Sequence, residues 1–356
     1  MKPILRLLAA AVTVGLLHAQ GSLTPPAGAP VPSMKTLAEI DNDVNSAASG
    51  IGSLQTTANS ILAAKDPRTP INSTTTPGTA ASNFRITTKG SYYLTGNITG
   101  ASGKAGIEIA TNDVTIDLMG FTMTGVPGSL DGIRSSFNYN IVIQNGTIRD
   151  FGGDGIDLRQ ANAFSFGSLI EGIIVFSNDG AGIIPNEASV VRRCIASANG
   201  GNGFSVWDYG TIEDCISTKN AGNGISCDSE VSVSRCSATA NTQDGILAFT
   251  SNRISGNHCS NNGSFTGNGA GIHATSGGNV IENNHCSFAD RGVDVDGTAN
   301  FIVRNTCYLN TVNWDIVANN VYGPIIDRTV PASAAVSGNS AASTLATTDP
   351  NANFSY

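Results

Sequence analysis

A glycine followed by a short apolar segment recurs along this chain of 356 residues. Such segments begin at Gly203, Gly224 and Gly245, which are evenly spaced. Two more begin at Gly271, after a longer step, and at Gly292, after the original step again. We interpret the longer step as an insertion absorbed within one repeat. A period of about 21 residues that returns after an insertion is typical of stacked structural units.

Each repeat is too short to hold a helix and predicts three short strands, whose side chains alternate between inside and outside. Counting the glycine starts from Gly106 to Gly292 gives nine units, and Trp314-Asp315-Ile316 marks a tenth. A leucine-rich repeat has a similar period but needs a leucine scaffold that is missing here. The sequence therefore predicts an all-β parallel β-helix of about ten rungs over residues 91–326, and parallel connections are almost always right-handed.

Six of the seven cysteines follow the repeat. Three of their five steps equal the glycine period, and the steps that end at Cys259 and Cys286 are longer. We expect the six to occupy one equivalent position per rung and to form a column of buried free thiols. Disulfide bridges and a metal site are the alternatives. The seventh, Cys227, stands three residues after its glycine and should also point inward. The six residues of the column are Cys194, Cys215, Cys236, Cys259, Cys286 and Cys307.

Asparagines mark one turn of the repeat. Asn178, Asn199, Asn220 and Asn241 each lie four residues before the next glycine. Asparagine tolerates turn conformations, and stacked asparagines can bond to one another along a column. We expect a ladder of asparagine side chains at this turn.

The N-terminal residues 1–20 resemble a secretory signal peptide. Lys2 and Arg6 flank an apolar run that is short for a membrane span, and Leu17-His18-Ala19 offers a cleavage site. A retained anchor or a lipoprotein is the alternative. Residues 21–33 form a Pro/Gly-rich linker. We therefore predict a protein that is secreted or held at the cell surface, without a membrane span once the signal is removed.

Residues 34–65 predict one amphipathic helix, because their apolar residues alternate steps of three and four. Three interpretations remain open: a coiled coil that makes a homo-oligomer through residues 34–62, a helix that packs on the body or caps its first turn, and a frayed segment. Residues 66–90 are read as a connector. Residues 327–356 form an Ala/Ser/Thr-rich tail that is expected to cap the C-terminal end, since an open stack exposes unpaired strand edges.

Blocks before the repeats give the chain a family resemblance. They are Met34-Lys35-Thr36-Leu37, Arg68-Thr69-Pro70-Ile71 and Gly90-Ser91-Tyr92-Tyr93-Leu94-Thr95-Gly96-Asn97. With the repeats, the chain resembles right-handed parallel β-helix proteins of the pectin-lyase-like superfamily, in particular secreted bacterial β-helix repeat proteins. That resemblance implies the fold but no single activity, because the superfamily includes lyases, hydrolases, esterases, epimerases and adhesins. The catalytic motifs of its hydrolases, lyases and alginate epimerases are missing, so no catalytic residue is carried over.

The charge balance excludes one class of partner. The net charge is −8 and the isoelectric point is about 4.9. A protein that binds nucleic acid presents a basic patch or stripe, and none is found in this sequence. We expect no nucleic-acid partner.

The residues two and four positions after each glycine should face outward and form one strip up the stack. Exposed aromatic rings beside polar groups suit the binding of sugar rings. Five residues of this strip are candidates for binding a substrate: Arg159, Trp207, Asp228, Phe249 and Asp296.

His273, Asp294 and Asp315 should stack on adjacent rungs of the same strip. Carboxylates one rung apart lie about 5 Å from each other, which is close to the separation in retaining glycosidases. These three residues are therefore the catalytic candidates. A calcium site that uses Asp294, Asp296 or Asp290 is an alternative, and so is plain solvated surface.

Two functions follow from this strip. The first is a non-catalytic surface protein that binds polysaccharide or another cell-envelope component. The second is a polysaccharide-active enzyme, a glycoside hydrolase or a polysaccharide lyase, working in a groove beside the glycine strands. No cofactor is required by either, although Ca²⁺ is compatible with the acidic residues.

Overall fold

The computed structural model describes residues 35–135, 137–159, 166–263, 269–327 and 347–355. The chain forms two compact units, which meet between Asp66 and Pro67. Among the described residues, the first unit contains one helix and the second contains the β-helix. Each unit is described by itself.

Helix α2 spans Leu37–Lys65. A capping box opens it, because the Thr36 amide donates to Glu39 Oε2 at 2.7 Å and the Glu39 amide donates to Thr36 Oγ1 at 3.3 Å. The apolar side chains of its heptad pattern are exposed, namely Leu37, Ile40, Val44, Ile51 and Leu54. No helix in the described part of the chain is long and apolar enough to span a membrane. Self-association of α2 and its packing on the body both stay predictions.

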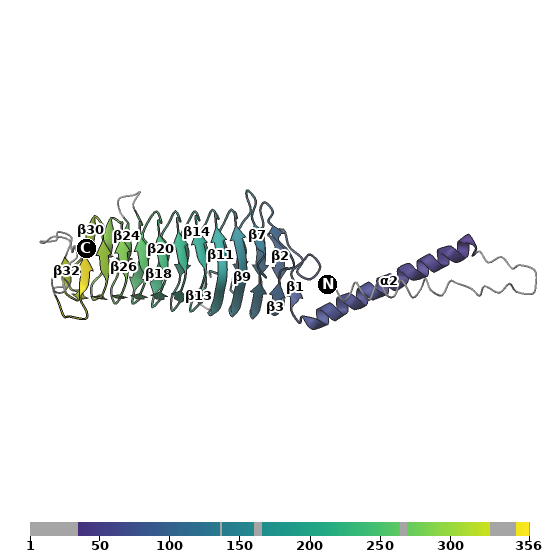
Figure 1. Ribbon diagram of the computed structural model, residues 1–356, viewed down its shortest axis with the longest axis horizontal. Helices are drawn as coiled ribbons and strands as arrows, with labels where there is room; N and C mark the ends of the chain where they lie inside the picture. Colours follow the sequence, from purple (N-terminus) through teal and green to yellow (C-terminus); the bar gives the residue numbers. More distant parts are fainter. Residues whose placement is uncertain (1–34, 136, 160–165, 264–268, 328–346, 356) are drawn as a thin grey trace, which may run out of the picture. The chain divides into compact units, whose positions relative to one another are not determined.

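The second unit is a stack of parallel strands, as Figure 1 shows. Eleven strands form one sheet, here called the glycine sheet. They are β2 (Ser82–Ile86), β5 (Ala105–Ile109), β8 (Ile133–Ser135), β10 (Ile156–Asp157), β12 (Ile183–Ile184), β15 (Phe204–Val206), β18 (Ile225–Ser229), β21 (Ile246–Thr250), β24 (Ala270–Ala274), β27 (Arg291–Val295) and β30 (Val312–Ile316).

The other 22 strands pair into a second sheet, which supplies the remaining sides of each turn. They are β1 (Thr69–Pro70), β3 (Gly90–Tyr93), β4 (Ile98–Thr99), β6 (Val114–Asp117), β7 (Thr122–Thr124), β9 (Ile141–Arg149), β11 (Ser168–Phe176), β13 (Val190–Arg192), β14 (Ile195–Ser197), β16 (Thr211–Glu213), β17 (Ile216–Thr218), β19 (Ser232–Ser234), β20 (Ser237–Thr239), β22 (Arg253–Ser255), β23 (His258–Ser260), β25 (Val280–Glu282), β26 (His285–Ser287), β28 (Phe301–Val303), β29 (Thr306–Tyr308), β31 (Val321–Tyr322), β32 (Ile325–Asp327) and β33 (Asn353–Ser355).

The predicted all-β parallel β-helix with an N-terminal helix is confirmed, with about eleven turns where about ten were counted. The additional rung begins at β2, which lies in the segment 66–90 that was read as a connector and which has no glycine start. At the other end, β33 in the C-terminal tail pairs with β29 and β32. The last residues of the tail therefore add to the end of the stack.

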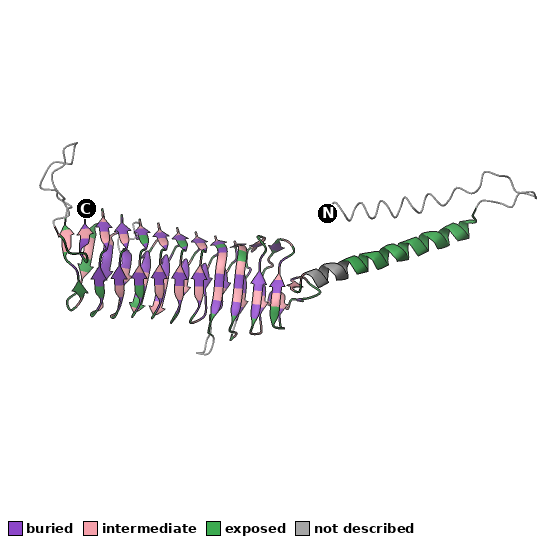
Figure 2. Cartoon of the chain, turned by 60° about the horizontal axis from the view of Figure 1, so that its bottom comes forward, coloured by how far each residue is buried: buried purple, intermediate pink, exposed green. Residues whose placement is uncertain are grey.

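The core is a column of inward side chains. The buried residues that supply them are coloured purple in Figure 2. On the glycine sheet, Phe204, Ile225, Ile246, Ile272 and Val293 pair on successive rungs and are fully buried. Burying an aliphatic side chain of this size contributes about 1.5–3 kcal/mol. The alternating pattern of the sequence is thus the pattern of the core.

All seven cysteines are buried free thiols, so the interpretation of the cysteines as core is confirmed. Their assignment to a single column is wrong. Cys194, Cys215 and Cys236 stack in one column, whereas Cys259 pairs with Ala238 in a column two residues further on. The other members of that second column are Cys286 and Cys307. The longer step from Cys236 to Cys259 is therefore a change of column and not an insertion.

The predicted asparagine ladder is confirmed and is longer than expected. Each side-chain amide donates to the side-chain oxygen of the asparagine one rung on, at 3.0 Å, from Asn178 through Asn199, Asn220 and Asn241 to Asn262. A second ladder joins Asn257, Asn284, Asn305 and Asn353. It continues the column that Cys194, Cys215 and Cys236 begin, because the Cys236 amide donates to Asn257 Oδ1.

Candidate functional site

The outward face of the glycine sheet carries one continuous column of side chains. Strand register places these residues on eleven successive rungs: Arg85, Glu108, Arg134, Asp157, Ile184, Ser205, Ser226, Leu247, His273, Asp294 and Asp315. The column is charged at both ends and small or apolar in the middle. His273, Asp294 and Asp315 therefore lie on adjacent rungs, as the spacing predicts.

The middle of this face holds an aromatic hollow of ≈ 280 Å³. Trp207 is 41% exposed and Phe249 is 44% exposed. The Asp228 side chain lies in the same hollow, and its pKa is raised by burial and by the nearby Asp208. The lining residues are Arg159, Ile184, Ser205, Val206, Trp207, Ser226, Asp228 and Phe249. The hollow brings together four of the five predicted binding residues.

Arg159 separates the aromatic hollow from a second, polar one of ≈ 510 Å³. Its Nη2 lies 2.7 Å from Asp154 Oδ2 and 2.8 Å from Asp157 Oδ2. These two carboxylates hold the guanidinium in place. The charged residues that line the polar hollow are Arg85, Glu108, Asp131, Arg134, Asp157 and Arg159.

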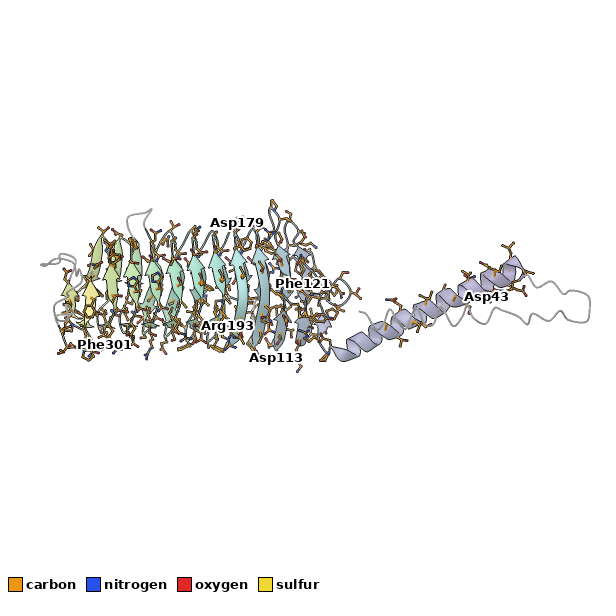
Figure 3. All side chains as sticks on the ribbon, viewed as in Figure 1. Asp43, Asp113, Phe121, Asp179, Arg193 and Phe301 are labelled. Carbon is orange, nitrogen blue, oxygen red and sulfur yellow. The ribbon has the colours of Figure 1, made fainter. Side chains whose placement is uncertain are left out.

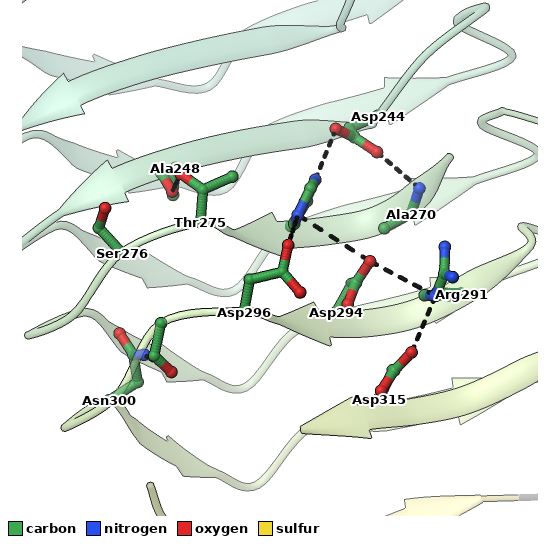
Figure 4. Close-up of polar contacts among 12 residues, drawn as sticks. Asp244, Ala248, Ala270, Thr275, Ser276, Arg291, Asp294, Asp296, Asn300 and Asp315 are labelled. Carbon is green, nitrogen blue, oxygen red and sulfur yellow. Dashed lines mark hydrogen bonds and ion pairs between the residues drawn. The ribbon is translucent and has the colours of Figure 1, made fainter. Parts of the chain in front are cut away.

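His273 on β24 lies between carboxylates of the two neighbouring rungs. Figure 4 labels these carboxylates, which belong to Asp244, Asp294 and Asp296. Its Nδ1 lies 3.1 Å from Asp244 Oδ2, and its Nε2 lies 3.1 Å from Asp296 Oδ2. Asp294 Oδ2 is 3.9 Å from the same Nε2. The fifth predicted binding residue, Asp296, thus belongs to this histidine cluster and not to the aromatic hollow.

Asp244 stands immediately before Gly245, at the position that precedes the glycine in each repeat. At this position the side-chain oxygen accepts a hydrogen bond from the amide one rung on, as when Asn223 Oδ1 accepts from the Asp244 amide at 3.0 Å. Asp244 Oδ1 in turn accepts from the Ala270 amide at 2.7 Å. The other oxygen of this buried carboxylate is left to hold His273.

Arg291 stands at the same position before Gly292 and lies between the two predicted catalytic carboxylates. Its Nε is 3.5 Å from Asp294 Oδ2 and 3.0 Å from Asp315 Oδ2. Its Nη1 is 3.3 Å from Asp290 Oδ2. The guanidinium of Arg291 therefore bridges Asp294 and Asp315. The carboxylate of Asp290 contacts the same guanidinium.

The pKa of His273 reflects opposing effects. Burial is the largest single effect and favours the neutral ring, but Asp244, Asp296 and Asp294 together outweigh it and raise the pKa to about 9. The pKa of Asp294 is raised, mainly by burial, against the lowering effects of His273 and Arg291. At neutral pH the cluster therefore contains a protonated imidazole.

Asp244 and Arg291 were not among the residues that the sequence indicated. Both precede a glycine, a position that also holds Asp131, Asp154, Asn202 and Asn223 in other rungs. That repeated polar position was the available signal. It was overlooked because only the positions after the glycine were expected to face outward.

Residues 82–230 match a family model described as "Right handed beta helix region". This match, with the strand pairing, confirms at the level of the fold the resemblance found in the sequence. The comparison with curated proteins gave no match.

Solved structures with a similar chain path share little sequence. The A-module of the Azotobacter vinelandii mannuronan C-5 epimerase AlgE6 is 14% identical, with a TM-score of 0.49, over 66% of this chain and 91% of that one. Pectate lyase Pel9A is 14% identical, with a TM-score of 0.41, over 65% and 64%. PfbA, a surface adhesin of Streptococcus pneumoniae, is 8% identical, with a TM-score of 0.33, over 64% and 82%. At these levels we take no activity from them.

Proposed function

We propose that this right-handed β-helix protein binds polysaccharide or a related cell-envelope component through the aromatic hollow of its glycine sheet. The observation that carries the proposal is the pair of exposed rings, Trp207 and Phe249, beside the polar side chains of Arg159 and Asp228. Aromatic faces cover the apolar face of a sugar, while charged and amide groups orient its hydroxyls. The stacked rungs repeat this surface along one direction, as a polymer repeats its sugars.

The proposal predicts that Trp207→Ala/Phe249→Ala weakens polysaccharide binding at least about tenfold, since buried aromatic anchors carry much of the energy of an interface. The measurement is affinity electrophoresis or pull-down of the full chain with a panel of neutral glucans, xylan, polygalacturonate and alginate. A polysaccharide that the wild type retains and the double variant does not is the expected result.

Phe301→Ala/Phe288→Ala is the matched control. Phe301, labelled in Figure 3, is 44% exposed like Phe249, and Phe288 is 49% exposed, but neither lies on the glycine sheet. If both double variants lose binding equally, or if the wild type retains no member of the panel, the aromatic hollow is not the binding site.

A second candidate function is polysaccharide cleavage or lyase chemistry at the histidine cluster. The specific observation is the imidazole of His273, which is protonated at neutral pH and lies beside Asp294, whose pKa is raised. A proton donor next to a carboxylate is a pairing that general acid–base catalysis uses. This candidate requires new reducing ends or 4,5-unsaturated product from an acidic polysaccharide. It also requires that Asp294→Asn abolishes the product.

The helix unit adds a proposal about assembly. Leu37, Ile40, Val44, Ile51 and Leu54 are exposed along α2 at a/d spacing, and exposed apolar stripes of this kind associate as coiled coils. The proposed partner is a second copy of this chain. We also propose that the protein is secreted or held at the cell surface. Sedimentation analysis should show an oligomer that Ile51→Asp converts to a monomer. A monomeric wild type would rule the association out.

A further inference from the structure

We propose that His273, Asp294 and Asp296 form a binding site for one divalent cation of the zinc class. The site lies on the glycine sheet, on the rungs of β24 and β27, away from the lining of the aromatic hollow. The proposal does not depend on polysaccharide binding. It gives the outward face a second kind of ligand.

The donor atoms already lie close together. One ligand atom from each of the three residues lies within 4.8 Å of the other two. His273 Nε2 is 3.1 Å from Asp296 Oδ2 and 3.9 Å from Asp294 Oδ2. Bonds of about 2.1 Å to a zinc ion place neighbouring ligands about 3.0–3.4 Å apart. Side-chain rotations that move the donor atoms by about 1 Å would complete this arrangement without moving a strand.

Asp294 supplies an independent observation. The residue is 7% exposed, yet its carboxylate accepts no hydrogen bond from the described part of the chain. Its cationic neighbours, His273 Nε2 and Arg291 Nε, lie 3.9 and 3.5 Å away, which is beyond ordinary hydrogen-bond length. The carboxylate is largely buried, and its described partners are these two long ion pairs, which compensate its desolvation less well than short contacts do. A cation bound beside His273 would satisfy it.

Asp244 orients the imidazole for this role. When Asp244 Oδ2 accepts the Nδ1 proton at 3.1 Å and the metal displaces the Nε2 proton to solvent, the lone pair of Nε2 points toward Asp294 and Asp296. Metal-bound histidines commonly donate their other ring nitrogen to a carboxylate, which fixes the tautomer and strengthens the ligand. The backbone amide of Ala270 holds Asp244 in turn. The site therefore has a rigid support behind its nitrogen ligand.

The mixture of donors selects the class of metal. Calcium takes oxygen ligands, whereas imidazole nitrogen suits zinc and its neighbours. The carboxylates around the site, which are Asp244, Asp290, Asp294, Asp296 and Asp315, outnumber the cationic Arg291. Asp296 is 62% exposed in its side chain, so part of the coordination sphere is open to solvent. An open position of this kind can take water or a ligand oxygen.

The test is calorimetric titration of the chelator-treated, tag-free full chain with ZnCl₂. The expected result is one Zn²⁺ per chain, with affinity weakened at least about tenfold by Asp296→Asn and by His273→Gln. Asp228→Asn is the matched control, because Asp228 holds the same place, four residues after its glycine, without a histidine beside it. It should bind Zn²⁺ as the wild type does.

Co²⁺ in place of Zn²⁺ identifies the donor atoms. Ligation by one nitrogen and two carboxylates gives weak visible bands without thiolate charge transfer, which separates this site from the cysteine columns. Circular dichroism confirms that the variants are folded. Zn²⁺ binding that is absent, that survives both Asp296→Asn and His273→Gln, that shows thiolate charge transfer, or that is weaker than Ca²⁺ binding at the same residues would overturn the proposal.

Discussion

Replacing Gly224 by alanine is expected to lower the free energy of unfolding of the β-helix by about 3 kcal/mol, as overpacking of a tight contact does. A Cβ atom at this position would lie 2.6 Å from the carbonyl oxygen of Gly245 and 2.6 Å from Asn241 Nδ2. The oxygen belongs to the backbone of the next rung and the amide belongs to the asparagine ladder, so neither can move without breaking paired hydrogen bonds. The measurement is urea unfolding followed by far-UV circular dichroism.

Gly96→Ala is the control for the same chemical change. A Cβ at Gly96 would meet no atom within 4 Å, and its backbone is not in the left-handed region. This substitution should leave the midpoint unchanged or raise it slightly, because alanine restricts the unfolded chain. Equal midpoints for the two variants would show that contact between rungs at the glycine does not set the period.

That contact explains why the fold could be read from the sequence. A Cβ atom added to any glycine of the series would lie 2.5–2.7 Å from a backbone carbonyl oxygen of the next rung. The close contact recurs once per rung and excludes a Cβ each time. Glycine therefore occupies this position in every rung from Gly106 to Gly292. A backbone contact of this kind tolerates insertions elsewhere in the turn, which is why the period survives the longer step before Gly271.

The prediction of a single cysteine column was wrong for the opposite reason. A small buried side chain fits at either of two inward positions, so the same residue type appears in two columns. Asn257, which lies one repeat after Cys236, is the true continuation of the first column. Strand pairing places Ile281 opposite Ile254 and Cys286 opposite Cys259, so the insertions lie after Cys259. Residue type alone does not fix register when two positions accept the same residue.

The site was predicted in part. The stacking of His273, Asp294 and Asp315 follows from the period and was found. The contacts of Asp244 and Arg291 depend on the direction of side chains that stand before a glycine, at the edge of the strand. Asp244 and His273 are also separated by the insertion that precedes Gly271, which hides their proximity in the sequence. Periodicity gives positions on a face, whereas the partners of a charged side chain depend on its rotamer.

The electrostatic state of His273 leads to the second large effect, a loss of stability as the pH rises from about 6.5 to 9. The histidine has a pKa of about 9 in the folded chain, against a usual value near 6.5. Because the folded state binds the proton more tightly, the stabilisation is fully present below the unfolded pKa and is lost as the pH rises through the folded one. A difference of this size corresponds to about 3 kcal/mol.

The comparison that isolates this effect is urea unfolding of the wild type and of His273→Gln between pH 6 and 9, with a chelator present. Burial lowers the pKa of His285 in both proteins, so its effect on stability at the acidic end of this range cancels in the difference. Burial raises the pKa of the Cys227 thiol in both proteins, so its effect cancels in the difference. The two stability curves should converge as the pH approaches 9. Parallel curves would mean that Asp244, Asp294 and Asp296 do not hold a protonated imidazole, and the second candidate function would then lose its proton donor.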